Sequence, residues 1–308
     1  MKRLQNQIAE SRKTLPIAIL YGVGVWLMAG LVQHHWWFQF LCFFASVYTM
    51  IHLNNVNLLI RIYSRAVSVS YLMLGCATVW LFPSVSGAIL QCGTALMLFL
   101  LFACYQDTGA TGKTFYVFLL ISVMCLTEPH YLLLIPAVYL LLATTVYALS
   151  IRTFLASLIG LITPYWFYTG WQLFLHPDQP AMALAYLTRF SEMQWLPLHT
   201  DLTLSQLLYL LLVAVLFVVG TIHFWLTSYM DKIRVRNIYA SLNLLAVYTL
   251  ILMVVQPHQY NTFIPVLTLS ASPVIAHFMA LTRTRLSNLF FIVALCAVLL
   301  LTAYNLWI

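Results

Sequence analysis

The chain has 308 residues, of which 63% are hydrophobic and 7% are charged, and its 14 Lys and Arg against 7 Asp and Glu give a net charge of +7. A soluble domain carries roughly 25% charged residues, so this apolar excess excludes an ordinary water-soluble domain and indicates a membrane protein. The basic residues lie in short gaps between apolar runs, where they face anionic lipid head groups; we therefore expect membrane lipids, and not nucleic acid, as partners.

Apolar stretches of about the 20 residues that a helix needs to cross a bilayer core follow one another along the whole chain. No linker or second class of composition interrupts them, which predicts one all-α integral membrane domain over residues 1–308, a polytopic bundle of transmembrane helices. The eleven predicted spans are 15–32, 36–52, 66–81, 87–105, 109–127, 131–149, 153–174, 204–229, 237–255, 262–281 and 286–307.

The charges in the gaps between these spans predict the orientation. If the amino terminus is cytoplasmic, thirteen of the fourteen Lys and Arg fall on the cytoplasmic side and only Arg189 lies outside, as the positive-inside rule requires. The carboxyl terminus is then outside, and the predicted location is a bacterial inner membrane. The thirteen residues are Lys2, Arg3, Arg12, Lys13, Arg61, Arg65, Lys113, Arg152, Lys232, Arg234, Arg236, Arg283 and Arg285.

The first outer turn reads Gln33-His34-His35-Trp36-Trp37. Its imidazoles are candidates for binding substrate phosphate, while its indoles are typical anchors at the membrane interface. The segment has no acidic or Cys ligand beside the histidines, and the six cysteines show no CxxC spacing, so no metal site is predicted. No nucleotide-binding or metalloprotease motif occurs, and no cofactor is expected.

The cytoplasmic gap before residue 66 holds Arg61 and Arg65. Residues four apart lie one helical turn apart, so the two side chains are candidates to clamp a phosphate or a lipid head group. Ordinary positive-inside charge is the alternative interpretation.

The outer end of the span 109–127 is followed by Glu128, Pro129 and His130. The apolar part of that span, 115–127, is only about 20 Å long at 1.5 Å per residue, so the helix has to recruit residues 109–114 or thin the membrane. Glu128 is therefore our candidate catalytic base, set below the membrane surface, and His130 a candidate substrate-binding residue. A solvated acid beside a turn-forming proline is the alternative.

Aromatic residues gather near the outer half of the span 153–174, where Tyr165 and Trp166 are candidates to stack on sugar rings or isoprenoid chains. Interfacial anchoring explains part of this set. The longest gap follows it, and helical spacing of apolar residues there predicts an amphipathic helix along the outer interface near residues 180–195, either a cover for the bundle or a lid over an outward cavity.

A polar run without charge precedes the span 262–281. Its His258, Gln259 and Tyr260 are candidate substrate-binding residues, and the helix that follows carries Pro265 and Pro273. Prolines remove backbone donors and can break a membrane helix so that carbonyls face a bound group, although such breaks also serve packing alone.

The segments Cys125-Leu126-Thr127-Glu128-Pro129-His130 and Leu158-Ile159-Gly160-Leu161-Ile162-Thr163-Pro164-Tyr165 resemble an uncharacterised family of bacterial polytopic inner-membrane proteins of unknown function. More distantly, the hydrophobic pattern resembles the membrane cores of GT-C glycosyltransferases. That resemblance implies an envelope-biogenesis protein handling a polyprenyl-phosphate-linked sugar at the outer face. GT-C enzymes usually carry an acidic residue in the first outer loop, and this chain has His34 and His35 there instead.

Three classes of function stay open on the sequence. A transferase acting on a lipid-linked substrate would use Glu128 as its base. A lipid or solute transporter would use the broken helices, but charged residues are almost absent from the predicted helix centres. A non-catalytic membrane subunit or scaffold would need none of these groups, so the sequence does not decide whether the protein is an enzyme.

Overall fold

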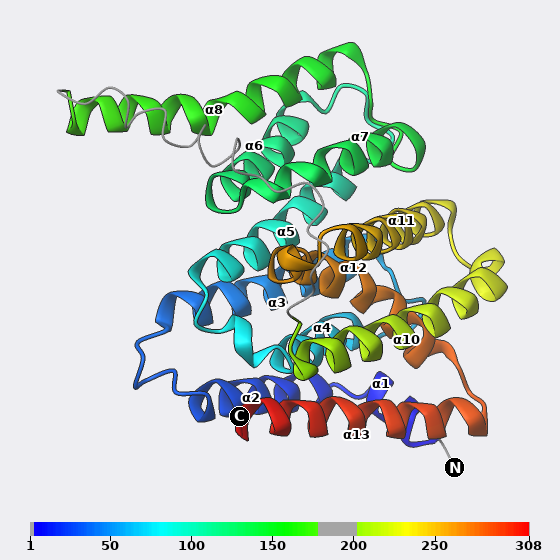
Figure 1. Ribbon diagram of the computed structural model, residues 1–308. Helices are drawn as coiled ribbons and strands as arrows, with labels where there is room; N and C mark the ends of the chain where they lie inside the picture. Colours follow the sequence, from blue (N-terminus) through cyan, green and yellow to red (C-terminus); the bar gives the residue numbers. More distant parts are fainter. Residues whose placement is uncertain (1–2, 178–201, 308) are drawn as a thin grey trace.

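The computed structural model describes residues 3–177 and 202–307, and within these ranges all regular structure is helical. The helices pack side by side as a bundle (Figure 1). Five apolar helical segments are long enough to cross a membrane, as judged by length and composition: Val85–Ala103, Leu204–Met230, Ile233–Val255, Pro257–Leu281 and Arg285–Trp307. The predicted helix near residues 180–195 lies outside the described residues.

Each of the eleven predicted ranges contains a helix. The α-helices are α1 (Leu4–Glu10), α2 (Thr14–Met28), α3 (Trp37–Asn57), α4 (Ala66–Cys76), α5 (Val85–Ala103), α6 (Thr111–Thr127), α7 (Ile135–Thr144), α8 (Ile151–Leu175), α10 (Leu204–Thr227), α11 (Ile233–Val255), α12 (Tyr260–Leu281) and α13 (Arg285–Trp307). In the described ranges, four short 3-10 helices accompany them: η1 (Val79–Leu81), η2 (Pro129–Leu134), η4 (Ser228–Met230) and η5 (Pro257–Gln259).

Two of these helices are shorter than their predicted spans. α4 has 11 residues, about 16 Å, because its last turn tightens into 3-10 bonds: the amide of Thr78 donates to the carbonyl of Gly75, and so does the Thr78 hydroxyl. α7 has 10 residues because the chain first forms η2 after Pro129. Pro136 then lies in the first turn of α7, where backbone N–H groups have no partner within the helix, so the missing N–H of proline costs no hydrogen bond.

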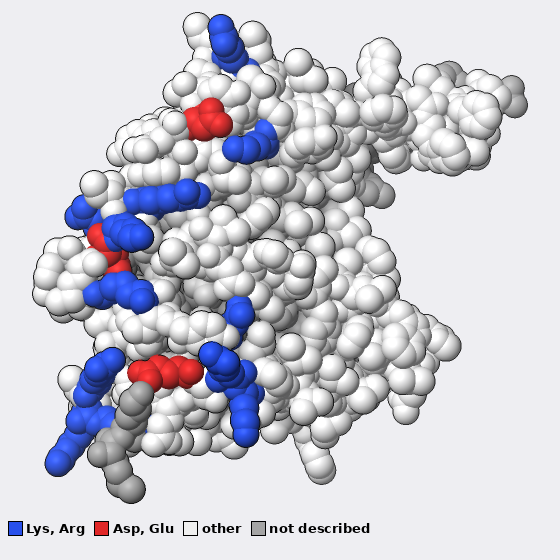
Figure 2. Space-filling model, turned by 180° about the vertical axis from the view of Figure 1, so that it is seen from behind, with Lys and Arg blue, Asp and Glu red and all other residues white. Residues whose placement is uncertain are grey.

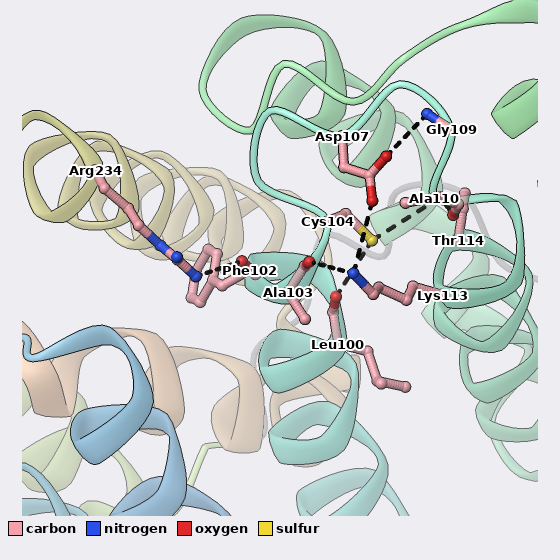
Figure 3. A network of polar contacts seen from close by, with 10 residues as sticks. All are labelled: Leu100, Phe102, Ala103, Cys104, Asp107, Gly109, Ala110, Lys113, Thr114 and Arg234. Carbon is pink, nitrogen blue, oxygen red and sulfur yellow. Dashed lines mark hydrogen bonds and ion pairs between the residues drawn. The ribbon is translucent and has the colours of Figure 1, made fainter.

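Helix α6 begins at Thr111 and so recruits part of the polar segment before its apolar run, as its length requires. Lys113 lies inside this first turn and reaches back to the end of α5, where its Nζ donates to the Ala103 carbonyl at 3.0 Å and lies 3.7 Å from an Asp107 oxygen (Figure 3). Arg234 donates to the neighbouring carbonyl of Phe102. Two basic side chains thus satisfy carbonyls at the end of α5 that have no partner within the helix.

Helix α12 is the central element of the bundle, since it packs against α1, α4, α5, α10 and α11. In its most hydrophobic stretch 89% of the residues are buried, against 28% for α13. Its polar side chains bond inside the protein: the hydroxyls of Thr268 and Tyr209 are 2.9 Å apart. α12 is therefore surrounded by protein on all sides.

Helices α6 and α8 pack against one another at a glycine. A Cβ atom on Gly160 of α8 would lie 2.5 Å from the backbone oxygen of Phe115 and 3.2 Å from the amide nitrogen of Leu119, both in α6. Close by, the Ser122 hydroxyl donates to the Leu161 carbonyl at 2.6 Å. Small residues allow this close approach of two backbones, as is common between helices in membranes.

Basic residues of the described chain gather along one edge of the bundle (Figure 2). This edge, called the basic edge below, is the end of the bundle at which α1, α11 and α13 begin. Arg3 donates to the Arg283 carbonyl there, whereas Asn305, near the other end of α13, donates to the carbonyl of Ala77. Since α13 has 23 residues, about 34 Å, the two ends of the described chain lie at opposite ends of the bundle.

Candidate functional site

A cavity of about 380 Å³ lies between α1, α2, α4, α12 and α13. Polar side chains line it where these helices meet the basic edge: Gln5, Thr14 and Arg65. Farther along the helices the wall is almost entirely apolar and includes Ile17, Val69, Met73, Met279, Ala294 and Val298. The cavity therefore has one polar end and an apolar interior that follows the helix axes.

Arginine side chains gather at the polar end of the cavity. Arg65 lies at the amino end of α4, its guanidinium is 5.5 Å from the centre of the Tyr63 ring, and its Nη1 donates to Asn55 at 2.9 Å. The guanidinium of Arg12 lies 5.9 Å from the same ring. Among the described residues, neither arginine forms an ion pair with a carboxylate. The two guanidinium groups thus contact the uncharged Tyr63 ring and, for Arg65, the Asn55 amide, so no carboxylate of the described residues neutralises their positive charge.

Gln5 also lies at this end of the cavity and joins α1 to α12. The residue is 1% exposed, and its Nε2 donates to the carbonyl of Met279 at 2.6 Å and to the hydroxyl of Thr282 at 2.7 Å. A carbonyl can only accept, which assigns the amide orientation. Its Oε1 is buried and has no partner in the described part of the chain, so it does not face the open space of the cavity.

A second polar feature is a buried charge cluster of Arg61, Asp231, His277 and His223. The Asp231 side chain is 1% exposed; one carboxylate oxygen lies 2.9 Å from Arg61 Nε and the other 3.2 Å from Nε2 of the fully buried His277. The ring centres of His277 and His223 are 5.6 Å apart. The cluster brings together the linker after α3, the start of α11, and helices α10 and α12.

The cluster holds these segments together. None of its four residues lines the cavity, so it does not contact whatever occupies that space. Tyr239 adds to the same arrangement, since its ring lies 5.0 Å from that of His277 and its hydroxyl donates to the carbonyl of Leu59 in the linker after α3. A carboxylate buried with two partners is stable only while both stay in place.

The structure separates the two arginines for which we predicted a common phosphate clamp. α3 ends at Asn57, its capping residue Leu58 has a left-handed φ of 51°, and the residues from Leu58 to Arg65 form no helix. The prediction assumed that Arg61 and Arg65 lie one turn apart on a helix. The structure has no helix at these residues. Arg61 points to Asp231, and only Arg65 lines the cavity.

In the turn between α2 and α3, His34 and His35 are exposed. The His34 ring stacks on that of Trp36, with ring centres 4.7 Å apart. His35 has a φ of 55°, which turns the chain toward α3. Their predicted role in phosphate binding stays a prediction.

The remaining predicted site residues lie in different settings. Glu128 caps the end of α6 and is half-buried, as are His130 in η2 and Tyr165 in α8, whereas Trp166 is 75% exposed. Their substrate-binding and catalytic roles also stay predictions.

At the start of α12, the predicted residues already serve the fold. Gln259 accepts a hydrogen bond from Thr262, and the buried Tyr260 donates to the carbonyl of Gln206 in α10. His258 is exposed. In the described ranges, no hydrogen bond, ion pair or ring contact joins any two of Glu128, His130, Trp166, His258 and Tyr260.

Comparison of the chain with protein-family models, with curated proteins and with solved structures finds no match. Function has to be inferred from the cavity, the charge cluster and the arrangement of the helices.

Sequence reasoning missed most of what the structure brings together. Asp231 is an acidic residue among basic ones, and His223 and His277 are the histidines inside apolar spans; both facts were signals for buried partners. Gln5 gave no signal, because the segment before the first span was interpreted only as a topology determinant, whereas it forms α1.

Proposed function

We propose that the chain is a multi-pass protein of the bacterial inner membrane that handles a lipid-linked substrate and holds the hydrocarbon part of that substrate in the cavity. The observation that carries this proposal is the polarity of the cavity, which has Arg65 and Gln5 at the basic edge and apolar walls along the helices. A lipid in a bilayer has the same order of polar and apolar parts along the membrane normal. A volume of about 380 Å³ is in the range of ligand-binding pockets.

In the proposed topology eleven helices cross the membrane, the basic edge faces the cytoplasm and the carboxyl terminus is outside. The gathering of Lys and Arg on one edge supports this arrangement (Figure 2), as do the five long apolar helices. α4 and α7 are short for a crossing, but most of α4 is buried in the bundle, where protein and not lipid satisfies the ends of a short helix.

The topology predicts the behaviour of fusions after Trp307. A periplasmic reporter, alkaline phosphatase, is expected to be active there, and a fluorescent protein that folds only in the cytoplasm is expected to be dark. The same reporters fused after Thr282, at the basic edge between α12 and α13, should give the opposite pattern. Cytoplasmic activity at Trp307 would contradict the eleven-span arrangement.

Filling the cavity is expected to expel the lipid. Ala294 is buried and lines the cavity, so Ala294→Phe places a ring in the space that the hydrocarbon chain needs. Val293→Phe is the matched control, because Val293 is the next residue of α13 and its side chain is 59% exposed. Mass spectrometry of lipid extracted from the purified proteins should show a several-fold loss in the first variant only. Equal lipid content in both would contradict the proposed function.

A transferase site at the opposite end of the bundle is the second candidate. It has one observation in its favour: Glu128 is half-buried where α6 ends, which is a suitable setting for a general base.

If this second candidate is right, Glu128→Gln should lower transfer of a labelled sugar from a polyprenyl-phosphate donor in membrane vesicles by about 10²-fold or more. Asp107→Asn, an exposed acid at the basic edge, is the control. Full turnover by Glu128→Gln would reject the enzyme. If the cavity also proved free of lipid, a non-catalytic subunit or a solute transporter would take its place.

A further inference from the structure

We infer that the occupant of the cavity is a phosphate-bearing lipid, whose phosphate binds Arg65 with the support of Arg12 and one of whose hydrocarbon chains fills the apolar part. This inference rests on the proposed function and adds the chemistry of the head group. It depends on the polar end of the cavity, where Arg65 lines the wall and the guanidinium of Arg12 lies near the same Tyr63 ring.

The first step is the state of the two arginines. Three other basic residues of the same edge are paired with acids in the described ranges, namely Arg61 with Asp231 at 2.9 Å, Lys113 with Asp107 at 3.7 Å and Arg283 with Glu10 at 3.9 Å, whereas Arg65 and Arg12 are among those that are not. Arg65 and Arg12 are held by the Tyr63 ring, and Arg65 also by the neutral Asn55. A guanidinium with N–H groups left over binds phosphate oxygens in a planar, two-bond geometry.

The second step is the amino end of α4. Arg65 is the residue that precedes this helix, and its own side chain does not cap the helix; the first amide, that of Ala66, donates to the Ser64 hydroxyl at 3.1 Å. The unpaired amides of a helix start carry a partial positive charge and favour an anion. A phosphate at Arg65 would therefore interact with the side chain and with the end of α4 together.

Phosphate-bearing lipids come from two sources, glycerophospholipids and polyprenyl phosphates. The test is native mass spectrometry of the full chain in detergent micelles with phosphatidylglycerol and with a polyprenyl phosphate. Each is compared with the matching lipid that lacks the phosphate, diacylglycerol or the polyprenol. The ratio of the two affinities within a pair reports recognition of the phosphate, and a preference between the pairs identifies the source.

In the unsubstituted protein we expect one of the phosphate lipids to bind more tightly than its partner. Arg65→Gln should reduce that advantage about tenfold or more, as expected for loss of a charge-assisted bond. Arg12→Gln should reduce it less. Arg236→Gln is the control, because it removes one exposed charge from the same edge. Binding of the phosphate-free lipids should stay unchanged in all three variants.

Two results would overturn the inference. One is equal affinity for phosphate-bearing and phosphate-free lipids in the unsubstituted protein. The other is an equal effect of Arg65→Gln and Arg236→Gln, which would show that Arg65 acts only as one of several surface charges and not as a phosphate ligand. In both cases the loss of lipid on Ala294→Phe can still hold, so a failure of the head-group assignment is distinguishable from a failure of the proposed function.

Discussion

Asp231→Asn is expected to destabilise the protein strongly. The substitution keeps the shape of the side chain but removes the negative charge between Arg61 and the buried His277. Breaking a fully buried pair by neutralising one partner costs about 3–5 kcal/mol; the Arg61 side chain that is left uncompensated here is 31% exposed, so solvent screening makes that range an upper limit. We expect a thermal unfolding midpoint in detergent lower by several degrees and weaker accumulation in the membrane.

Asp107→Asn is the control for this experiment. Asp107 lies 3.7 Å from Lys113, and both side chains are about half exposed, so this pair should contribute less than about 1 kcal/mol. Asn can also keep the bond from the Gly109 amide. Equal unfolding midpoints for the two variants would show that the charge cluster does not hold its four segments together.

Gly160→Leu is expected to separate α8 from α6. A Cβ at this position would lie 2.5 Å from the Phe115 backbone oxygen, and backbone cannot move aside as a side chain can. Overpacking a close interface typically costs about 1–3 kcal/mol, and a branched side chain against backbone should reach the upper end. The same displacement would break the bond from Ser122 to the Leu161 carbonyl.

Gly170→Leu in the same helix provides the comparison. No atom lies within 4 Å of a Cβ built on Gly170, so the same change of residue type meets open space. Unfolding in detergent followed by circular dichroism should show a lower midpoint for the Gly160 variant only. If both variants unfold at the same temperature, the close approach of α6 and α8 does not limit stability.

The positions of the helices could be predicted from the sequence because lipid-length apolar runs are a local property of the chain. The recruitment of residues before Phe115 into α6 followed from length alone. The exact ends of α4 and α7 did not follow, since they depend on 3-10 turns at Thr78 and Pro129, which apolar runs do not encode.

The site was largely beyond the reach of the sequence because its parts come from distant segments. Arg61 and Asp231 meet only when the linker after α3 packs beside the start of α11. The cavity is lined by helices from both ends of the chain, α1 and α13. A cavity between helices does not change the periodicity of apolar residues in either helix, so the sequence gives no sign of it. The candidates chosen by residue type, such as Trp166, were judged without knowing which face of the helix is exposed.

The enclosed position of α12 has a consequence for biogenesis. Of the twelve α-helices in the described ranges, ten are made before α12 leaves the ribosome, and α13 follows it. Until it arrives, the Tyr209 hydroxyl lacks Thr268 and Asp231 lacks His277, and the space that α12 will occupy must hold lipid or water. A chain that stops before Tyr260 would present this polar, open interior to the membrane. Quality-control proteases that recognise unpaired polar groups in membrane helices should therefore degrade such truncated chains quickly. Insertion of α12 is then the step after which the chain resists degradation.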